Sequence, residues 1–241
     1  MKNLKSSLGL LCFGAAILPL LLPAAARASP FSLTLTTSFD CGSASPPAGA
    51  GSVKCSAALP QHLEWIQGSL PVSSLDLTDT VQTNVDAGSP AVIIGTIKHT
   101  NVVIPSQFSY TINILNSFSV KDQSDGSLDN FVQQAVGIKF TESLNSSPCP
   151  APNPEGSVCD DFFRFDVSGL TPVSFTDSEG ILRQVSFGLI AGPGTTIIGD
   201  QVFTAENATS SISFTAKIAP VDAPASMLLL GFGLLILGFV S

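Results

Sequence analysis

QFSYTINILNSFSV, the stretch of residues 107–120, alternates apolar with polar side chains. The apolar residues Phe108, Tyr110, Ile112 and Ile114 lie two positions apart, with a polar residue between each pair. Successive side chains of a β-strand point to opposite faces of the sheet, so this spacing gathers the four side chains on one face. The stretch therefore predicts a strand that buries one face in a core.

Seven more segments alternate in the same way or are rich in Val and Ile, and Gly, Pro, Asn or Asp residues bound them. They are residues 31–39, 91–104, 131–144, 161–167, 181–191, 201–206 and 210–218. No part of the body shows the repeat typical of an amphipathic helix. About nine strands at turn-marked spacing predict an all-β fold, namely an antiparallel β-sandwich of jelly-roll-like type. We expect disorder in the Pro-, Gly- and Ser-rich loops at 42–52 and 146–157.

The N-terminus has the layout of a secretory signal peptide. Lys2 and Lys5 precede an apolar run over residues 8–22, and small residues occupy the last and third-last positions before Ser29. This pattern predicts a signal helix over residues 1–28 that is cleaved between Ala28 and Ser29. A membrane anchor that is never cleaved is the alternative.

The C-terminus combines a short polar segment with an apolar one. Val221, Asp222, Ala223 and Pro224 precede an apolar run over residues 227–240. A full membrane span needs roughly 20 apolar residues, so this run is short for one. It is apolar on every side, which distinguishes it from an amphipathic helix packed on the body. We expect an apolar helix that acts as a sorting or anchoring tail; a buried helix of the body is the alternative.

The body, residues 29–220, is long enough for one domain and strongly acidic. Seven of the ten basic residues and 17 of the 18 acidic residues fall within it, which gives a net charge near -10. Such a surface repels nucleic acid and anionic lipid, so we expect no nucleic-acid partner. Neutral sugars and divalent cations remain compatible with this charge.

The body contains four cysteines, an even number that favours disulfides in an exported chain. Of the three possible pairings, we favour Cys41 with Cys55 and Cys149 with Cys159, because each pair brackets a Pro-, Gly- or Ser-rich loop. A zinc site is the alternative, but the Cys-x-x-Cys spacing that such sites favour is missing.

The C-terminal tail resembles the PEP-CTERM sorting signals of exported proteins in Gram-negative bacteria. It departs from the usual pattern in two ways: Val221 to Pro224 replaces Val-Pro-Glu-Pro, and no basic cluster follows the apolar run. The resemblance implies export by the Sec machinery and recognition by an exosortase-type membrane peptidase. It also implies an association with exopolysaccharide, and transient or permanent anchoring in the inner membrane.

An ordered set of short motifs in the body is similar to the THxN family of PEP-CTERM proteins. His99 and Asn101 match the Thr-His-x-Asn motif, and Lys98 stands where the family has Thr. The other matching elements are Trp65, Gly68, Phe140-Thr141-Glu142 with Asn145, Cys159-Asp160-Asp161-Phe162 and Phe203-Thr204-Ala205-Glu206-Asn207. The resemblance implies a surface or matrix protein and assigns no catalytic residue.

His99, Asn101, Glu142 and Asn145 are the candidate site residues. Such side chains could bind a sugar or a metal, and a His beside a carboxylate can exchange protons. The competing interpretation is a hydrogen-bonded network that ties neighbouring strands and turns, because buried polar groups are usually satisfied in this way. The residues alone favour the network and leave binding open.

An acidic loop supplies a second candidate. Asp122, Asp125 and Asp129 surround Gly126, and carboxylate oxygens of this kind can bind Ca²⁺. Their spacing differs from that of an EF-hand loop, and a solvated turn is the simpler interpretation.

Enzymatic signatures are missing from the sequence: it has no Gly-x-Ser-x-Gly elbow, no His-Glu-x-x-His and no phosphate-binding loop. Glu142, Glu206, Asp160 and Asp161 could supply the carboxylate pair of a glycosidase. Against sugar binding, the chain has only one Trp and one Tyr. The sequence thus predicts a non-enzymatic, exopolysaccharide-associated protein of the cell envelope or extracellular matrix. A lectin or glycan-acting enzyme that uses Glu142 and its neighbours is the alternative.

Overall fold

The computed structural model describes residues 30–45, 51–66, 72–103, 107–149, 151–166, 168 and 170–221. The predicted signal peptide, its cleavage point at Ala28 and Ser29, and the tail after Val221 lie outside the described residues. Within the described ranges, no helix is long and apolar enough to cross a membrane.

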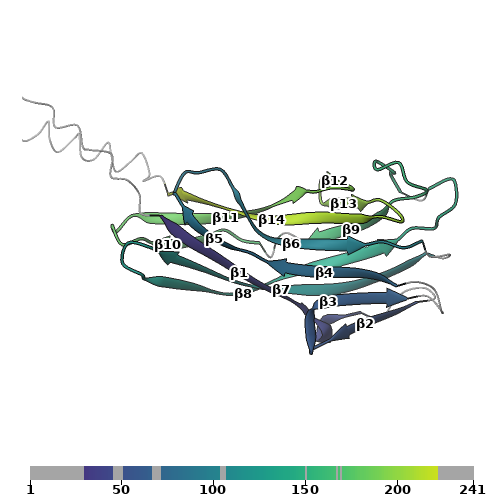
Figure 1. Ribbon diagram of the computed structural model, residues 1–241, viewed down its shortest axis with the longest axis horizontal. Coiled ribbons are helices and arrows are strands. Elements are labelled where there is room, and N and C mark those ends of the chain that lie inside the picture. The colour runs from purple at the N-terminus through teal and green to yellow at the C-terminus, as the bar shows by residue number, and fades with distance from the viewer. Residues whose placement is uncertain are drawn as a thin grey trace, which may run out of the picture.

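Two seven-stranded sheets, antiparallel throughout, make up the body (Figure 1). The first sheet has the order β12 (Thr195–Ile198), β13 (Gln201–Thr204), β9 (Asp161–Asp166), β8 (Leu128–Glu142), β7 (Phe108–Asp122), β1 (Phe31–Asp40) and β5 (Val81–Val85). The second has the order β10 (Val173–Thr176), β11 (Leu182–Ala191), β14 (Thr209–Pro220), β6 (Val92–Thr100), β4 (Ser73–Asp79), β3 (Leu59–Ile66) and β2 (Ser52–Ser56). A short 3-10 turn, η1 (Cys41–Ser43), follows β1. The all-β, antiparallel prediction is confirmed.

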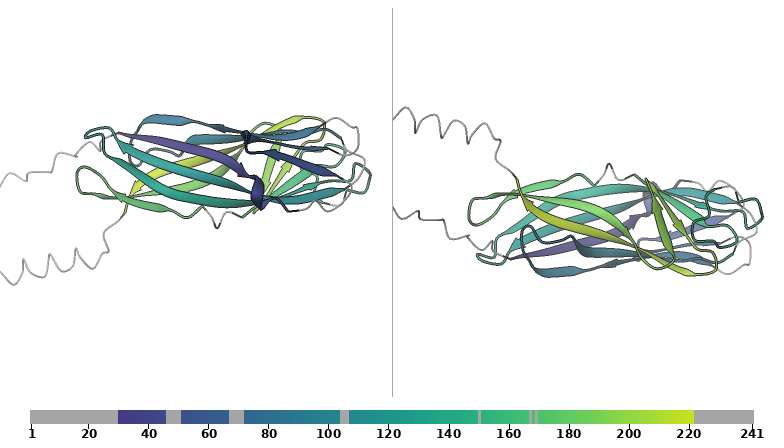
Figure 2. Two further views of the ribbon diagram at one scale, coloured as in Figure 1. Left: turned by 90° about the horizontal axis from the view of Figure 1, so that it is seen from below. Right: turned by 90° about the horizontal axis from the view of Figure 1, so that it is seen from above.

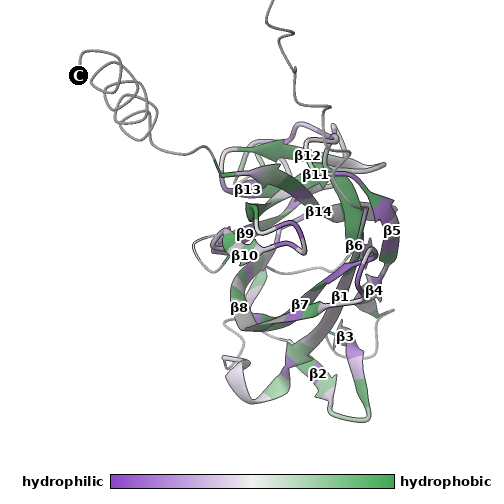
Figure 3. Ribbon diagram, turned by 90° about the vertical axis from the view of Figure 1, so that its left-hand side faces the viewer, coloured by the Kyte–Doolittle hydropathy of each residue, from purple (hydrophilic) through white to green (hydrophobic). Residues whose placement is uncertain are grey.

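Period-two alternation builds the core from both sheets. Phe108, Tyr110, Ile112 and Ile114 of β7 are all buried, as their spacing predicted. Apolar and polar residues alternate along the strands in Figure 3. Aromatic pairs cross from one sheet to the other: the ring centroids of Trp65 and Phe140 lie 4.5 Å apart. The two inner faces therefore share one sandwich-like core, in which each fully buried large side chain contributes about 1.5–3 kcal/mol.

All eight predicted segments contain a strand, but the described residues form 14 strands rather than about nine. The segments without a strand prediction are β2, β3, β4, β5, β10 and β12. Four of them, β2, β5, β10 and β12, have only four or five residues, too few for a periodic pattern to stand out. Their pairing with neighbouring strands makes them strands, which is a tertiary effect.

The second loop that we expected to be disordered is instead held by hydrogen bonds. The Asp160 carboxylate accepts hydrogen bonds from the backbone N–H groups of Glu155 and Ser157, at 2.7 and 3.3 Å. In return, the Asn153 side chain accepts a hydrogen bond from the Asp160 N–H. This part of the prediction was wrong because composition does not reveal a carboxylate that organises its own loop.

Both predicted disulfides are present. Cys41 pairs with Cys55, and Cys149 pairs with Cys159. The first bond links η1, at the end of a first-sheet strand, to β2 of the second sheet. The second bond closes the loop between β8 and β9. The pairing prediction is confirmed, and these four cysteines are not available as zinc ligands.

The elongated body has two distinct ends (Figure 2). Strand β1 begins and β14 ends at the same end, on the left of Figure 1. The antiparallel registers place the end of β8, the start of β9 and the β13–β14 turn at the opposite end. The candidate site lies at this second end, far from where the described chain begins and stops.

Candidate functional site

Side chains from widely separated parts of the chain meet between the sheets at this end. Glu142 is the last residue of β8, Asp161 the first of β9, and Glu206 lies in the turn after β13. We call these three residues the acidic triad. The second sheet contributes Trp65 from β3 and His99 from β6. All five are buried.

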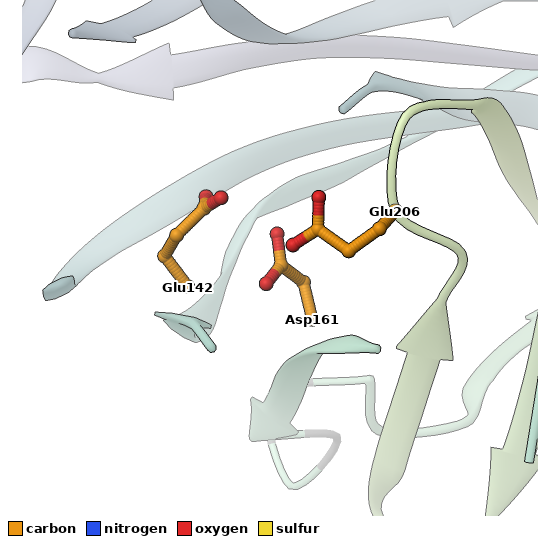
Figure 4. Close-up of side chains that lie close together, drawn as sticks. All are labelled: Glu142, Asp161 and Glu206. Atoms are coloured by element: carbon orange, nitrogen blue, oxygen red, sulfur yellow. The ribbon is translucent and has the colours of Figure 1, made fainter. Parts of the chain in front are cut away.

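The carboxylates of the acidic triad face one another, with one oxygen of each within 4.8 Å of the others (Figure 4). The Trp65 indole N–H donates a hydrogen bond of 2.9 Å to Glu142 Oε2. The Ser143 backbone N–H donates one of 2.7 Å to Asp161 Oδ1. Glu142 Oε1 and Asp161 Oδ2 have no hydrogen-bond partner of ordinary geometry among the described residues, and Asn145 and the Asn207 N–H reach the Glu206 carboxyl only at looser geometry. Two buried oxygens without donors and the loosely held Glu206 carboxylate thus converge.

Burial disfavours negative charge in the triad. It raises the pKa of Glu142 to about 8. Burial, followed by the charges of Glu142 and Glu206, raises the pKa of Asp161 well above its ordinary value. Burial also raises the pKa of Glu206, against the opposite effect of Asn145. Three adjacent buried carboxylates cannot all be ionised near neutral pH unless a positive charge compensates them. Protons or a cation must therefore neutralise the triad.

His99 is neutral and packed among aromatic rings. Burial lowers its pKa to about 3, so the imidazole carries no charge at physiological pH. The ring stacks on Trp65 at 5.4 Å and meets the edge of Phe163 at 5.1 Å. Its Nδ1 lies 3.0 Å from the Thr204 hydroxyl. These contacts tie β6 of the second sheet to β3, β9 and β13.

Asn101 holds the turn that carries Glu206. Its side-chain amide donates to the Ala205 carbonyl at 3.2 Å, and its backbone N–H donates to the Ala208 carbonyl at 2.9 Å. The Asn145 side chain forms a hydrogen bond with the Glu206 carboxyl, which acts to lower the pKa of that carboxyl against the effect of burial. Asn101 and Asn145 thus both form hydrogen bonds with the β13–β14 turn. Glu142 and His99 both contact Trp65, through a hydrogen bond and ring stacking respectively.

The structure therefore brings the four predicted residues into one region and adds the carboxylates Asp161 and Glu206. The sequence had offered those two only as members of a possible glycosidase pair. Their position within the Cys-Asp-Asp-Phe and Phe-Thr-Ala-Glu-Asn motifs was the available signal. What the sequence did not reveal was the Trp65 hydrogen bond, because it joins residues 77 positions apart.

The Asp122 loop has a different role. Both oxygens of the Asp122 carboxylate accept hydrogen bonds, one from Ser124 and the other from Ser178. Although burial acts in the opposite direction, these bonds lower the pKa of Asp122 to about 2. Asp125 accepts a hydrogen bond from the Ser127 N–H. Over the ranges that the structure covers, the acidic triad is the group of potential ligands that gathers in space, and Asp122, Asp125 and Asp129 do not form one.

The second histidine lies on the outside of the second sheet. His62 Nδ1 is 2.6 Å from Asp76 Oδ1, and His62 Nε2 is 3.0 Å from Glu64 Oε1. These two hydrogen bonds, the one to Glu64 first, raise the pKa of His62. The imidazole is one-third exposed, so this ion-pair group is separate from the buried site.

No protein-family model and no curated protein matches this chain.

Proposed function

We propose that this chain is an exported, non-enzymatic protein of the cell envelope or extracellular matrix. The pair of disulfides carries the proposal, because such bonds form and persist in oxidising compartments outside the cytoplasm. The signal-like N-terminus and the sorting-like tail point to the same location. We attribute the delivery to a PEP-CTERM-like tail read by an exosortase-type peptidase, and the body to a THxN-like protein.

We also propose that the two sheets form a jelly-roll-like sandwich. The chain passes repeatedly between the sheets: β1 is in the first, β2 to β4 in the second, β5 in the first and β6 in the second. An experimental structure tests this assignment through the same strand order and the same shared core.

The burial of the site supports a non-enzymatic role. A glycosidase must place its two carboxylates on either side of an accessible sugar. Glu142 and Asp161 are both fully buried, so no polysaccharide reaches them in this conformation. Trp65 and Tyr110, the only Trp and Tyr of the chain, are buried as well and offer no stacking platform. Each of these observations weakens the lectin or glycan-acting alternative that uses Glu142.

The partner that we propose is an exopolysaccharide bound at the surface. A groove of about 360 Å³ on the first sheet is lined by Lys139, Arg164, Phe162 and Gln201, among others. Lys139 carries a positive charge, and Arg164 forms a salt bridge of 3.1 Å with Asp200, so both side chains offer N–H donors to sugar oxygens. Phe162 adds an apolar contact beside them.

Export is tested by producing the full chain in a Gram-negative host. We expect a new N-terminus at Ser29 and four body cysteines that resist alkylation until they are reduced. An intact N-terminus together with freely alkylated cysteines would refute the proposal.

The polysaccharide partner is tested by co-sedimentation with the exopolysaccharide of the source cell. We expect the double variant Lys139→Glu/Arg164→Glu to bind several-fold less, because carboxylates, which only accept, replace both N–H donors. Lys98→Glu, a charge reversal on the exposed face of the other sheet, is the matched control and should bind as the wild type does. Equal binding by all three proteins would exclude this groove.

A further inference from the structure

We propose that the acidic triad binds a calcium ion that locks this end of the two sheets together. The site is distinct from the polysaccharide groove, and it extends the proposed function rather than resting on it. The ligands are Glu142, Asp161 and Glu206, which come from three separate elements and meet at one point (Figure 4).

The pattern of satisfied and unsatisfied oxygens carries the proposal. Trp65 and Ser143 each occupy one oxygen of a triad carboxylate, and both donors therefore orient the remaining oxygen toward the centre. One oxygen of Glu142 and one of Asp161 are left for a ligand, together with the Glu206 carboxylate, which Asn145 and the Asn207 N–H hold only loosely. Carboxylate oxygens that face one another repel unless a proton or a cation lies between them. With one oxygen from each carboxylate, the triad would fill three coordination positions.

Two further buried polar groups point to the same ligand. The Tyr110 side chain is 2 % exposed, and its hydroxyl has no hydrogen-bond partner among the residues described. Burial, followed by the charges of Glu142 and Asp161, raises the pKa of that hydroxyl, which therefore lies close enough to the triad for both charges to act on it. The carbonyl oxygen of the Asn101 side chain is equally buried and unpartnered in the described structure, next to the turn that carries Glu206. Neither oxygen belongs to the acidic cluster itself, and both are of the type that a hard cation accepts.

The chemistry of these donors selects calcium. All of the converging atoms are oxygens, whereas zinc prefers sulfur and nitrogen ligands. Magnesium demands near-ideal octahedral geometry and retains several waters, which suits an open site better than one enclosed by aromatic rings. Calcium accepts six to eight oxygens in flexible geometry, including amide carbonyls. Against three negative charges, a divalent ion leaves one, which the Trp65 and Ser143 N–H groups help to stabilise.

The position of the ion gives it a structural role. It would connect β8 and β9 of the first sheet to the turn that leads into β14 of the second. Through Trp65, the same contact extends to β3. Calcium is abundant outside cells, and extracellular modules typically bind it with Kd values of about 10⁻⁴–10⁻³ M.

The test exploits the single tryptophan of the chain. Terbium replaces calcium in oxygen sites and luminesces when a nearby excited indole transfers energy to it. The full chain, with its disulfides formed, is stripped with a chelator and titrated with Tb³⁺ under indole excitation. We expect saturable emission that excess Ca²⁺ displaces, and a Tm that rises by about 5–10 °C when Ca²⁺ reaches 100 times its Kd.

Amide variants locate the ion. Asp161→Asn and Glu206→Gln keep the side-chain volume and should lose both the indole-sensitised emission and the Ca²⁺-dependent rise in Tm, while circular dichroism reports an intact fold. Asp125→Asn, in the exposed acidic loop, should retain both. Folded wild-type protein that shows neither response would overturn the proposal, and so would responses that survive in both triad variants. A Tm that rises with Mg²⁺ but not with Ca²⁺ would overturn the choice of ion.

Discussion

Replacing Glu142 with Gln is expected to stabilise the calcium-free protein, although it removes a charged group from the candidate site. Burial raises the pKa of this carboxyl to about 8 in the folded protein, from an ordinary value of 4.5. Near pH 7 the folded state must therefore hold a proton that the unfolded chain releases. The difference between pH 7 and the unfolded pKa corresponds to a penalty of about 3 kcal/mol. Gln keeps an oxygen for the Trp65 N–H and avoids this penalty.

Because the pKa of Glu142 is raised on folding, the Gln variant is more stable than the wild type only above a certain pH. Below about pH 4.5 the carboxyl is protonated in both states, so variant and wild type differ little. As the pH rises, the unfolded Glu142 ionises first, wild-type stability falls, and the advantage of Gln grows until it levels off above about pH 8. We expect a gain of about 2–3 kcal/mol near pH 7, or a Tm higher by roughly 4–12 °C.

Urea or thermal unfolding with a chelator present, repeated across this pH range, measures the effect. Glu179→Gln is the control: its side chain is exposed, so its stability should stay within about 0.5 kcal/mol of the wild type at every pH. A Glu142→Gln protein that is less stable than wild type near pH 7, or that shows the same pH profile, would refute the reasoning.

Three further predictions concern other parts of the body. Replacing Cys41 and Cys55 with Ser should lower the unfolding free energy by about 3 kcal/mol on the chain-entropy model, measured by urea denaturation; an unchanged midpoint would contradict it. Arg183→Met should destabilise by about 3–5 kcal/mol, because it leaves the Asp177 carboxylate, 2.7 Å away, buried without its cation; the double variant with Asp177→Asn should recover part of this loss. The pKa of His62, measured by NMR, should lie above 6.5. Its contribution to stability is then complete below pH 6.5 and disappears as the pH rises through the folded pKa. A pKa at or below 6.5 would show that Glu64 and Asp76 do not stabilise the protonated imidazole.

Much of the fold was predictable because it depends on local pattern. Strand β7 alternates over its whole length, and a strand with one apolar face must bury that face. The cysteine pairing was also predictable, since each bond closes a short loop. The short strands β2, β5, β10 and β12 were not, because they owe their conformation to the neighbours with which they pair.

Some residues of the candidate site could also be singled out from the sequence, and others could not. Glu142 and His99 could be singled out as polar residues within strand patterns, but nothing near them in sequence shows that Trp65 lies between them. Asp161 and Glu206 are two acids among many in an acidic body. Only their placement at one end of the molecule distinguishes them from the solvated carboxylates.

The sequence alone determined the all-β class, the two disulfides and the extent of the acidic body, since hydrophobic period, loop length and charge are all local properties. Its apolar ends also carry the prediction of export. Tertiary structure decided how 14 strands divide between two sheets and which three carboxylates are buried side by side. Desolvation and mutual repulsion act only once the chain has folded, and they are what turn three ordinary acids into a site that requires a proton or a cation.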